Sequence, residues 1–324
     1  MTTYKEIKGT QIEVLASDPS NPVEGQVWYN STSNVLKGQA ATTVGAWATG
    51  GSMNTARFSL AGAGASNSSA LAFGGRPYTA ITESYDGTSW TEVNDLNTAR
   101  GQLGGAGTQT SALGFGGEGP PTTAATESWN GTSWTEVNDL NAAKNFPGNA
   151  GADNTAALAF GGSPAPSVGT QNEIWNGTNW TETTDLNTAR YSMGCAGIST
   201  AALGAGGDTI PGAASALTEQ WNGSNWTEVG DLNTARYAMG GAGLYTSALV
   251  FGGFSPPDKT STEEWNGTNW TEVADLSPAR RYLSGAGTQT SALAFGGLLS
   301  TSSVGTTEEW LGAGAGLTRT FTDS

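Results

Sequence analysis

The chain of 324 residues contains no histidine and one cysteine, Cys195. The first absence excludes Ser-His-Asp triads, imidazole ligands for zinc or copper, and histidine-based pH switches. The second excludes an intrachain disulfide, a CxxC redox pair and a thiolate metal cluster. No other catalytic constellation is recognisable in the sequence. We therefore expect a protein that is not an enzyme and that holds neither a cofactor nor a metal ion.

Basic residues are also scarce: 13 Lys and Arg stand against 28 Asp and Glu, a formal net charge of −15. A nucleic acid would be repelled by this charge. No segment approaches the ~20 consecutive apolar residues of a membrane span, and the N-terminus MTTYKEIKGTQIEVL lacks the apolar core of a signal peptide. We expect no nucleic-acid partner, no membrane insertion and no export by an ordinary signal peptide.

What the chain has in abundance is an internal repeat. A basic residue, mostly within the sequence NTAR, recurs at intervals of 43 to 46 residues, at positions 57, 100, 144, 190, 236 and 280. A tryptophan lies ten residues before each of them, and a Gly-Gly doublet follows each by 16 to 18 residues. Six units in register indicate a repeat architecture.

Each unit contains the signals of four short strands. In the fifth unit they are Tyr237 to Leu244, Thr246 to Phe251, Thr262 to Trp265 and Trp270 to Leu276. Asn-Gly separates the last two strands, and this dipeptide between strand-like runs is a strong hairpin signal. Four strands per unit without helical periodicity predict a blade of a β-propeller.

The units resemble the kelch repeat, in which a Gly-Gly doublet, a tyrosine and a tryptophan recur at similar offsets. Here the third-strand aromatic is Tyr85 in one unit and tryptophan in the other five: Trp129, Trp175, Trp221, Trp265 and Trp310. The resemblance implies an all-β fold, a six-bladed kelch-like β-propeller over residues 47–311. The fourth unit departs from the pattern, with Ala205 before the doublet where the other five units carry phenylalanine.

The two ends of the repeat complement each other. The last unit has no tryptophan five residues after Trp310, whereas Trp47 is an outer-strand tryptophan with no other strands before it. We expect the strand around Trp47 to complete the sixth blade, because closure hides the edges that an open array would expose.

The charged residues of each unit have two interpretations. The acidic residues of the last two strands place charge on exposed sheet edges, which prevents edge pairing; calcium binding is the alternative, but no DxDxDG-type spacing supports it. The basic residues either form an anion-binding ring at the channel mouth or pair locally. The favoured partners are loop carbonyls or the aspartate five positions earlier: Asp95, Asp139, Asp185, Asp231 or Asp275.

The segments after the Gly-Gly doublets differ completely between units that are otherwise alike, and they carry most of the prolines. Six unlike loops on one face of a uniform scaffold indicate a recognition surface, with relaxed constraint on exposed loops as the alternative. Glycan recognition needs aromatic platforms flanked by polar groups. The candidate ligand-binding residues are therefore Arg76, Tyr78, Asp208, Thr209, Phe254, Asp258 and Lys259.

Residues 1–46 lie outside the repeat and contain a small hairpin signal over residues 26–38. The string DPSNPVEGQVWYNSTSNVLKG resembles N-terminal segments of tail-fibre and other virion proteins of phages, marine ones especially, and TRTFTDS at residues 318–324 resembles their C-terminal ends. The resemblance implies a virion location, on the exterior of tail or capsid. Residues 1–46 would anchor the chain to other virion proteins, residues 47–311 would form the propeller, and residues 312–324 a C-terminal tail.

Two functions follow from this interpretation. The first is a receptor-binding protein whose loops recognise a glycan or protein on the host surface. The second is a structural capsid-decoration or head-fibre protein that uses the propeller for protein contacts. The sequence leaves open whether the chain forms a homo-oligomer.

Overall fold

The computed structural model describes residues 12–19, 26–41, 45–163, 169–209, 213–313 and 316–321. These residues form β-strands and connecting loops, and none of them lies in an α-helix, so the described part contains no helix that could cross a membrane. The chain divides into two compact units. Unit 1 comprises residues 1–45 and 312–324, and unit 2 comprises residues 46–311.

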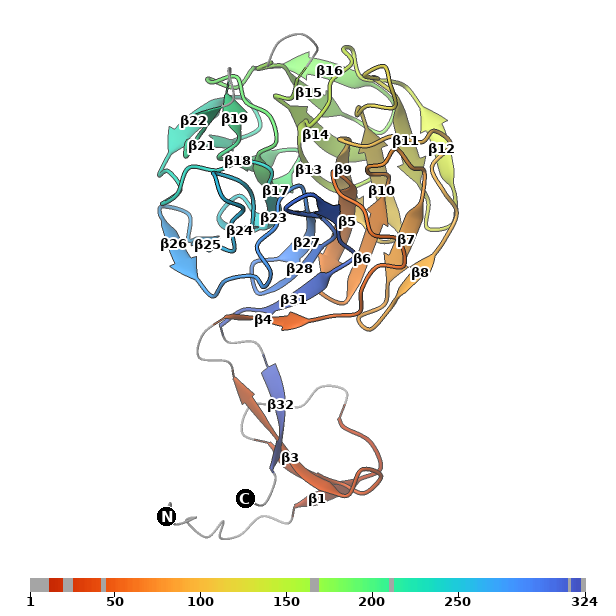
Figure 1. Ribbon diagram of the computed structural model, residues 1–324, viewed down its shortest axis with the longest axis vertical. Coiled ribbons are helices and arrows are strands. Elements are labelled where there is room, and N and C mark those ends of the chain that lie inside the picture. Colours follow the sequence, from red (N-terminus) through yellow and green to blue (C-terminus); the bar gives the residue numbers. More distant parts are fainter. Residues whose placement is uncertain are drawn as a thin grey trace. The chain divides into compact units, whose positions relative to one another are not determined.

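Unit 2 contains six four-stranded antiparallel sheets, each of which is a blade of a β-propeller. Figure 1 shows them arranged around a central axis. The strands of the first three blades, from the inside outwards, are β5 (Ala61–Ser66), β6 (Ser69–Phe73), β7 (Thr82–Tyr85) and β8 (Trp90–Glu92); β9 (Gly104–Thr108), β10 (Ser111–Phe115), β11 (Thr126–Trp129) and β12 (Trp134–Val137); β13 (Gly148–Asp153), β14 (Ala156–Phe160), β15 (Asn172–Trp175) and β16 (Trp180–Thr183).

The other three blades are built in the same way, and two of them carry a short extra hairpin after the Gly-Gly doublet, β19 (Asp208–Thr209) with β20 (Ala213–Ala214) and β29 (Leu298–Leu299) with β30 (Ser302–Ser303). Their main strands are β17 (Gly194–Ile198), β18 (Ala201–Ala205), β21 (Thr218–Trp221) and β22 (Trp226–Val229); β23 (Gly240–Leu244), β24 (Ser247–Phe251), β25 (Thr262–Trp265) and β26 (Trp270–Val273); β27 (Ser284–Thr288), β28 (Ser291–Phe295), β31 (Thr307–Leu311) and β4 (Ala46–Thr49).

The ring is closed by strand β4, as the sequence predicts. β4 pairs with β31 in the sixth blade, with Trp47 opposite Trp310. The innermost strands β5, β9, β13, β17, β23 and β27 contact each other in that order, and β27 contacts β5. The first strand of the unit therefore supplies the outermost strand of its last blade.

The hairpins between the two outer strands have the predicted Asn-Gly turns. In the second blade, Asn130 Oδ1 accepts hydrogen bonds from the backbone N–H groups of Thr132 and Ser133, both at 2.9 Å. Gly131 follows with φ of 92°, a conformation that favours glycine. Asp86 makes the same two contacts in the first blade, so either residue type satisfies this turn.

The core lies between neighbouring blades. In each of five interfaces, a phenylalanine at the end of a second strand packs on the outer-strand tryptophan of the next blade; Phe73 and Trp134, for example, have ring centroids 4.8 Å apart. Four of these tryptophans, and Trp270 of the fifth blade, donate their Nε1–H to a threonine at the start of the preceding blade's third strand, as Trp134 does to Thr82 at 3.1 Å. Large tryptophan side chains therefore supply much of the buried apolar surface in a chain of which only 36% of the residues are hydrophobic.

The repeated basic residues form buried ion pairs inside the blades, and the expected pairing with the preceding aspartates is wrong. Each basic side chain is fully buried and pairs with a buried glutamate in the second position of the same blade's third strand. These pairs are Arg57–Glu83, Arg100–Glu127, Lys144–Glu173, Arg190–Glu219, Arg236–Glu263 and Arg280–Glu308.

The asparagine of the NTAR sequence belongs to the same network. Asn187 donates both its backbone N–H and its side-chain Nδ2–H to Glu219 Oε2 at 2.8 Å, and Arg190 donates to Oε1 at 2.8 Å. Asp231, which the sequence offers as a partner for Arg236, instead accepts a hydrogen bond from the backbone N–H of Thr218. A buried ion pair requires such additional hydrogen bonds to offset its desolvation. The basic residues consequently form no anion-binding ring.

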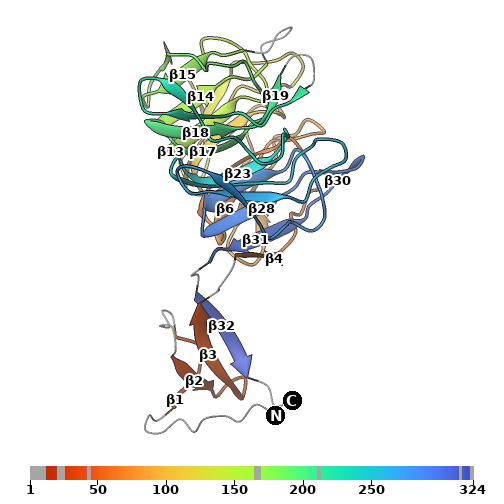
Figure 2. The ribbon, with the colours of Figure 1, turned by 90° about the vertical axis from the view of Figure 1, so that its left-hand side faces the viewer.

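Unit 1 contains a four-stranded sheet with the order β1 (Glu13–Leu15), β2 (Val27–Asn30), β3 (Val35–Ala41) and β32 (Gly316–Phe321), which Figure 2 shows side by side. The hairpin of β2 and β3 agrees with the sequence prediction. Of the expected C-terminal tail 312–324, residues 316–321 do not stand apart, because they form β32 and pair with β3. Asp18 accepts hydrogen bonds from Trp28, Asn30 and Lys37, and these contacts lower the pKa of Asp18 to about 2.

Candidate recognition face

One end of the propeller is built from two sets of segments, and we call it the loop face. The first set is the loops that follow the Gly-Gly doublets, and the second is the residues directly after each buried basic residue. Isolated β-bridges join the two sets in every blade: Phe58 with Arg76, Gly101 with Glu118, Asn145 with Ser163, Tyr191 with Asp208, Tyr237 with Phe254 and Arg281 with Leu298. The variable loops and the connections between blades therefore share one surface, as the sequence predicts.

A closed ring of backbone hydrogen bonds surrounds the axis at this face. Each of six residues donates its N–H to the carbonyl oxygen of the equivalent residue in the preceding blade, over 2.7–3.3 Å: Ser59, Gln102, Phe146, Ser192, Ala238 and Tyr282. All six have φ between 49° and 59°, a left-handed conformation that is uncommon for residues other than glycine. The ring fixes the positions from which these six side chains project around the axis.

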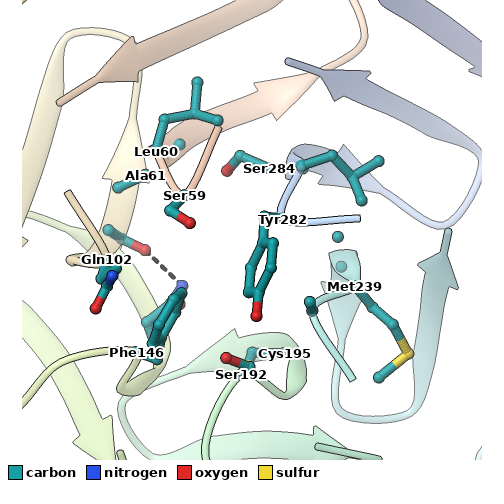
Figure 3. A pocket seen from close by; sticks show the side chains of 18 of the residues that line it. Ser59, Leu60, Ala61, Gln102, Phe146, Ser192, Cys195, Met239, Tyr282 and Ser284 are labelled. Carbon is teal, nitrogen blue, oxygen red and sulfur yellow. Dashed lines mark hydrogen bonds between the residues drawn. The ribbon is translucent and has the colours of Figure 1, made fainter. Parts of the chain in front are cut away.

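Phe146 and Tyr282 meet across the ring. They come from the third and sixth blades, and their rings are stacked with centroids 5.4 Å apart. Figure 3 shows them among the side chains that line a cavity of about 100 Å³, together with Ser59, Gln102 and Ser192. The hydroxyl oxygens of Ser59 and Ser192 are buried and have no hydrogen-bond partner within the described structure.

Among the sequence-predicted site residues, Arg76 and Tyr78 contact each other. Arg76 Nη2 donates to Tyr78 Oη at 2.8 Å and to Glu118 Oε2 at 2.5 Å, and its guanidinium lies 4.9 Å from the centroid of the Tyr78 ring. Tyr78 is 36% exposed. An exposed ring held in place by a neighbouring guanidinium is suited to contact a ligand without a large ordering cost.

Phe254 and Asp258 meet at a second arginine, Arg281, which the sequence analysis did not single out. Arg281 lies 4.6 Å from the centroid of the Phe254 ring and donates to Asp258 Oδ1 at 2.5 Å. The ring of Tyr237 packs edge-on against Phe254 at 5.6 Å. Lys259 is held in the same loop by backbone hydrogen bonds to Gly253 and Arg280.

Asp208 and Thr209 lie in the fourth blade, in hairpin β19–β20. Thr209 Oγ1 donates to the carbonyl oxygen of Ala213, so it stabilises the hairpin. Asp208 is 3% exposed, and its Oδ2 accepts a hydrogen bond from Tyr191 Oη at 2.6 Å. Burial and this carboxylate together raise the pKa of Tyr191 above its ordinary value, and the charge of Asp208 also contributes to raised pKa values for Tyr237 and Tyr282.

The structure thus separates the predicted residues into three groups, around Arg76, Asp208 and Phe254, and places aromatic residues between them that the sequence analysis missed. Phe58, Phe146, Tyr191, Tyr237 and Tyr282 are half-buried on the loop face. They occupy the two positions directly after the basic residue. Those positions vary in chemistry between units whose other positions repeat, and this variation is the signal that could have found them.

The opposite end of the channel has a different character. It opens into a cavity of about 250 Å³ lined by small residues of the six innermost strands. Its rim carries apolar side chains in the fourth and fifth blades, with Ile198 37%, Leu244 50% and Tyr245 40% exposed. Cys195 lines the channel between the two cavities, and burial raises the pKa of its thiol to about 12, so the reactive thiolate is scarce at neutral pH.

No family model matches the chain, and no curated protein matches it. Among solved structures, one reported as "Structure of YjhT" is similar with a TM-score of 0.66 and 13% sequence identity; the match covers 80% of this chain and 96% of that one. A likeness at this identity shows the fold alone, which is a β-propeller. Within the described residues, no group of three or more Cys, Asp or Glu side chains could hold a metal ion.

Proposed function

We propose that the protein is a non-enzymatic phage virion protein, a tail fibre or another receptor-binding protein, whose loop face recognises a glycan or receptor on the host surface. The observation that carries the proposal is the contrast between the scaffold and this face. Six blades repeat the same ion pair and nearly the same tryptophan contacts, whereas the residues they present at the loop face differ in every blade. Such a contrast is typical of a rigid scaffold that carries a binding surface.

The chemistry of the face supports carbohydrate recognition. Tyr78, Tyr237 and Phe254 offer ring faces or edges for the apolar side of a sugar, and Arg76 and Arg281 are already oriented by ion pairs for polar contacts. A rigid arrangement of this kind lowers the conformational entropy lost on binding. The absence of histidine removes the commonest general base and supports binding without catalysis.

The virion location rests on the resemblance of residues 1–46 to phage structural proteins. The division of the chain supports it, because unit 1 is a compact body separate from the propeller. Residues 1–46 would then attach the chain to tail or capsid proteins and leave the loop face for the host.

The test is the triple variant Tyr78→Ala, Phe254→Ala and Lys259→Ala in assembled particles. We expect adsorption to host cells to fall by about tenfold or more, as for loss of central contacts. The melting temperature should stay within a few degrees, because none of the three side chains belongs to the buried phenylalanine–tryptophan contacts between the blades. The matched control is Leu244→Ser with Tyr245→Ser at the other end of the channel, which should leave adsorption unchanged.

The exposed patch of Ile198, Leu244 and Tyr245 favours one alternative, a capsid-decoration or head-fibre protein that contacts other virion proteins through the propeller. Large exposed apolar side chains that lie together are typical of protein interfaces. If the control variant prevents particle assembly and the triple variant leaves adsorption unchanged, the alternative replaces the receptor-binding function.

A further inference from the structure

Among the described residues of the loop face, Asp208 is a buried carboxylate without a cationic partner. The other acidic residues that contact loop-face arginines are paired, Glu118 with Arg76 and Asp258 with Arg281, both at 2.5 Å. None of the ion pairs in the described part of the chain involves Asp208, and its Oδ1 is buried without a hydrogen-bond partner there. A buried carboxylate without a counter-charge makes the surface above it electronegative.

One tyrosine contacts this carboxylate, and two more of the loop face interact with it electrostatically. Tyr191 donates its hydroxyl hydrogen to Asp208 Oδ2, which increases the electron density of its ring. The ring of Phe146 connects Tyr191 to Tyr282, with centroids 6.1 Å and 5.4 Å from theirs. Burial raises the pKa values of Tyr237 and Tyr282; the charge of Asp208 adds to this effect and that of Arg281 opposes it. Tyr282 and Phe146 also line the cavity of about 100 Å³ at the axis. The negative faces of aromatic rings next to a carboxylate are the chemistry that binds organic ammonium groups.

The same face already holds two cations in this way. The guanidinium of Arg76 lies 4.9 Å from the centroid of Tyr78, and that of Arg281 lies 4.6 Å from the centroid of Phe254. Within the described residues no cation lies over Tyr191, Tyr237 or Tyr282. Arg281, which lies over Phe254, acts electrostatically on Tyr237 and Tyr282, but in the described structure it is stacked on neither ring.

We propose that the cluster of Tyr191, Tyr237, Tyr282 and Asp208 binds an organic ammonium group of the ligand. The group is either a protonated primary amine, such as an amino sugar carries, or a quaternary ammonium, such as a choline-type headgroup carries. This inference narrows the receptor-binding function proposed above and rests on it for its biological meaning. The binding itself is a property of the purified chain.

The experiment is a calorimetric titration of the full-length protein with choline and with 3,3-dimethylbutan-1-ol, its uncharged isostere. Glucosamine and N-acetylglucosamine form the second pair of probes. We expect the charged member of at least one pair to bind about tenfold or more tightly than the uncharged member. Preference for choline identifies the quaternary group as the ligand, and preference for glucosamine identifies the primary amine.

Variants locate the site. Asp208→Asn keeps an acceptor for Tyr191 but removes the charge, and it should weaken binding of the charged probe by about tenfold. Tyr237→Leu should weaken it similarly, whereas Tyr237→Phe, which keeps the ring, should not. The matched control is Asp86→Asn, which removes the same charge from a distant turn and reproduces the residue found there in other blades.

Equal affinity for both members of each pair, or unchanged binding by Asp208→Asn, would overturn the proposal. Because the titration uses purified protein, its result is independent of adsorption. If the purified protein binds the charged probe but Asp208→Asn particles adsorb normally, the ammonium site stands. That result contradicts only its role in host recognition.

Discussion

At the scale of residues, Trp226 marks the one blade interface of the described structure that lacks a hydrogen bond present in the other five. In the other five blade interfaces the outer tryptophan donates its Nε1–H to a threonine of the preceding blade, at 2.9–3.1 Å. In the interface of Trp226 the position is Asn172, and both Trp226 Nε1 and Asn172 Oδ1 are buried without a partner. A buried donor left unsatisfied costs about 1–3 kcal/mol.

We therefore predict that Asn172→Thr raises the free energy of unfolding by about 1 kcal/mol, because it restores the hydrogen bond to Trp226. Chemical denaturation measures the change. The matched control is Thr126→Asn, which creates the same mismatch opposite Trp180 and should lower stability by a similar amount. A stability unaffected or reduced by Asn172→Thr would show that the tryptophan needs no partner at this position.

The core of the fourth blade lacks a phenylalanine, and a side chain of the fifth blade fills part of the space. Ala205 stands where the other described blades end their second strand with phenylalanine, and Val250 of the fifth blade occupies the space near Gly194. A Cβ atom added to Gly194 would lie 2.6 Å from Val250 Cγ1, whereas in the third blade the equivalent glycine, Gly148, faces its own blade's Phe160 at 2.3 Å. Ala205 and Val250 belong to one buried cluster with Trp270.

This packing predicts that substitutions at Ala205 and Val250 have coupled effects on the free energy of unfolding. Ala205→Phe alone should destabilise the protein by about 1–3 kcal/mol through overpacking, and Val250→Ala alone should leave a cavity. Together they should cost at least ~1 kcal/mol less than the sum of the two, because the ring then fills the vacated space. Additive effects in a double-mutant cycle would contradict this packing account.

At the scale of elements, the last strand of the ring comes from its beginning. β4 contributes Trp47 to the sixth blade. The indole ring of Trp47 packs on Phe251, with ring centroids 4.9 Å apart, and its Nε1–H donates to Thr262 Oγ1 at 3.0 Å. Without β4, strand β31 would become an exposed edge and the interface between the fifth and sixth blades would lose its tryptophan.

We predict that deletion of residues 1–50 abolishes cooperative thermal unfolding and makes the chain prone to aggregation. Deletion of residues 1–44 serves as the control, since it removes the same part of unit 1 but retains β4, and its propeller should still unfold cooperatively. Calorimetry and light scattering distinguish the two chains. If both truncated chains unfold equally sharply, β4 is not required to close the propeller.

The sequence predicted the elements well because their signals are local. Asn-Gly turns, Gly-Gly doublets and alternating strands each depend on a few consecutive residues, and the count of tryptophans was enough to predict closure by Trp47. The partner of Arg190 could not be found in this way. Glu219 lies 29 residues further along the chain, and only the folded blade shows that this glutamate points inwards while Glu228 opposite it is exposed.

The candidate site was harder to predict for a similar reason. Tyr78 and Phe254 were found because they lie in visibly variable loops. Tyr191, Tyr237 and Tyr282 were missed because the residues after NTAR read as the start of a small-residue strand. Their left-handed backbone and their convergence on the axis arise only when six blades close into a ring.

At the scale of the whole molecule, the chain combines a propeller with a separate small sheet formed from both of its ends. The structural likeness to YjhT covers 80% of this chain and concerns the fold. The proposed function assigns attachment to residues 1–46 and recognition to the loop face, so the two roles lie in different units.

A cryo-EM map of the assembled particle would show whether attachment and recognition lie in different parts of the chain. We expect density for the chain on the exterior of the tail or capsid. Residues 1–46 should contact another virion protein, and the loop face, including Tyr78 and Tyr237, should be open to solvent. A map in which the loop face packs against the particle while residues 1–46 contact nothing would contradict this expectation.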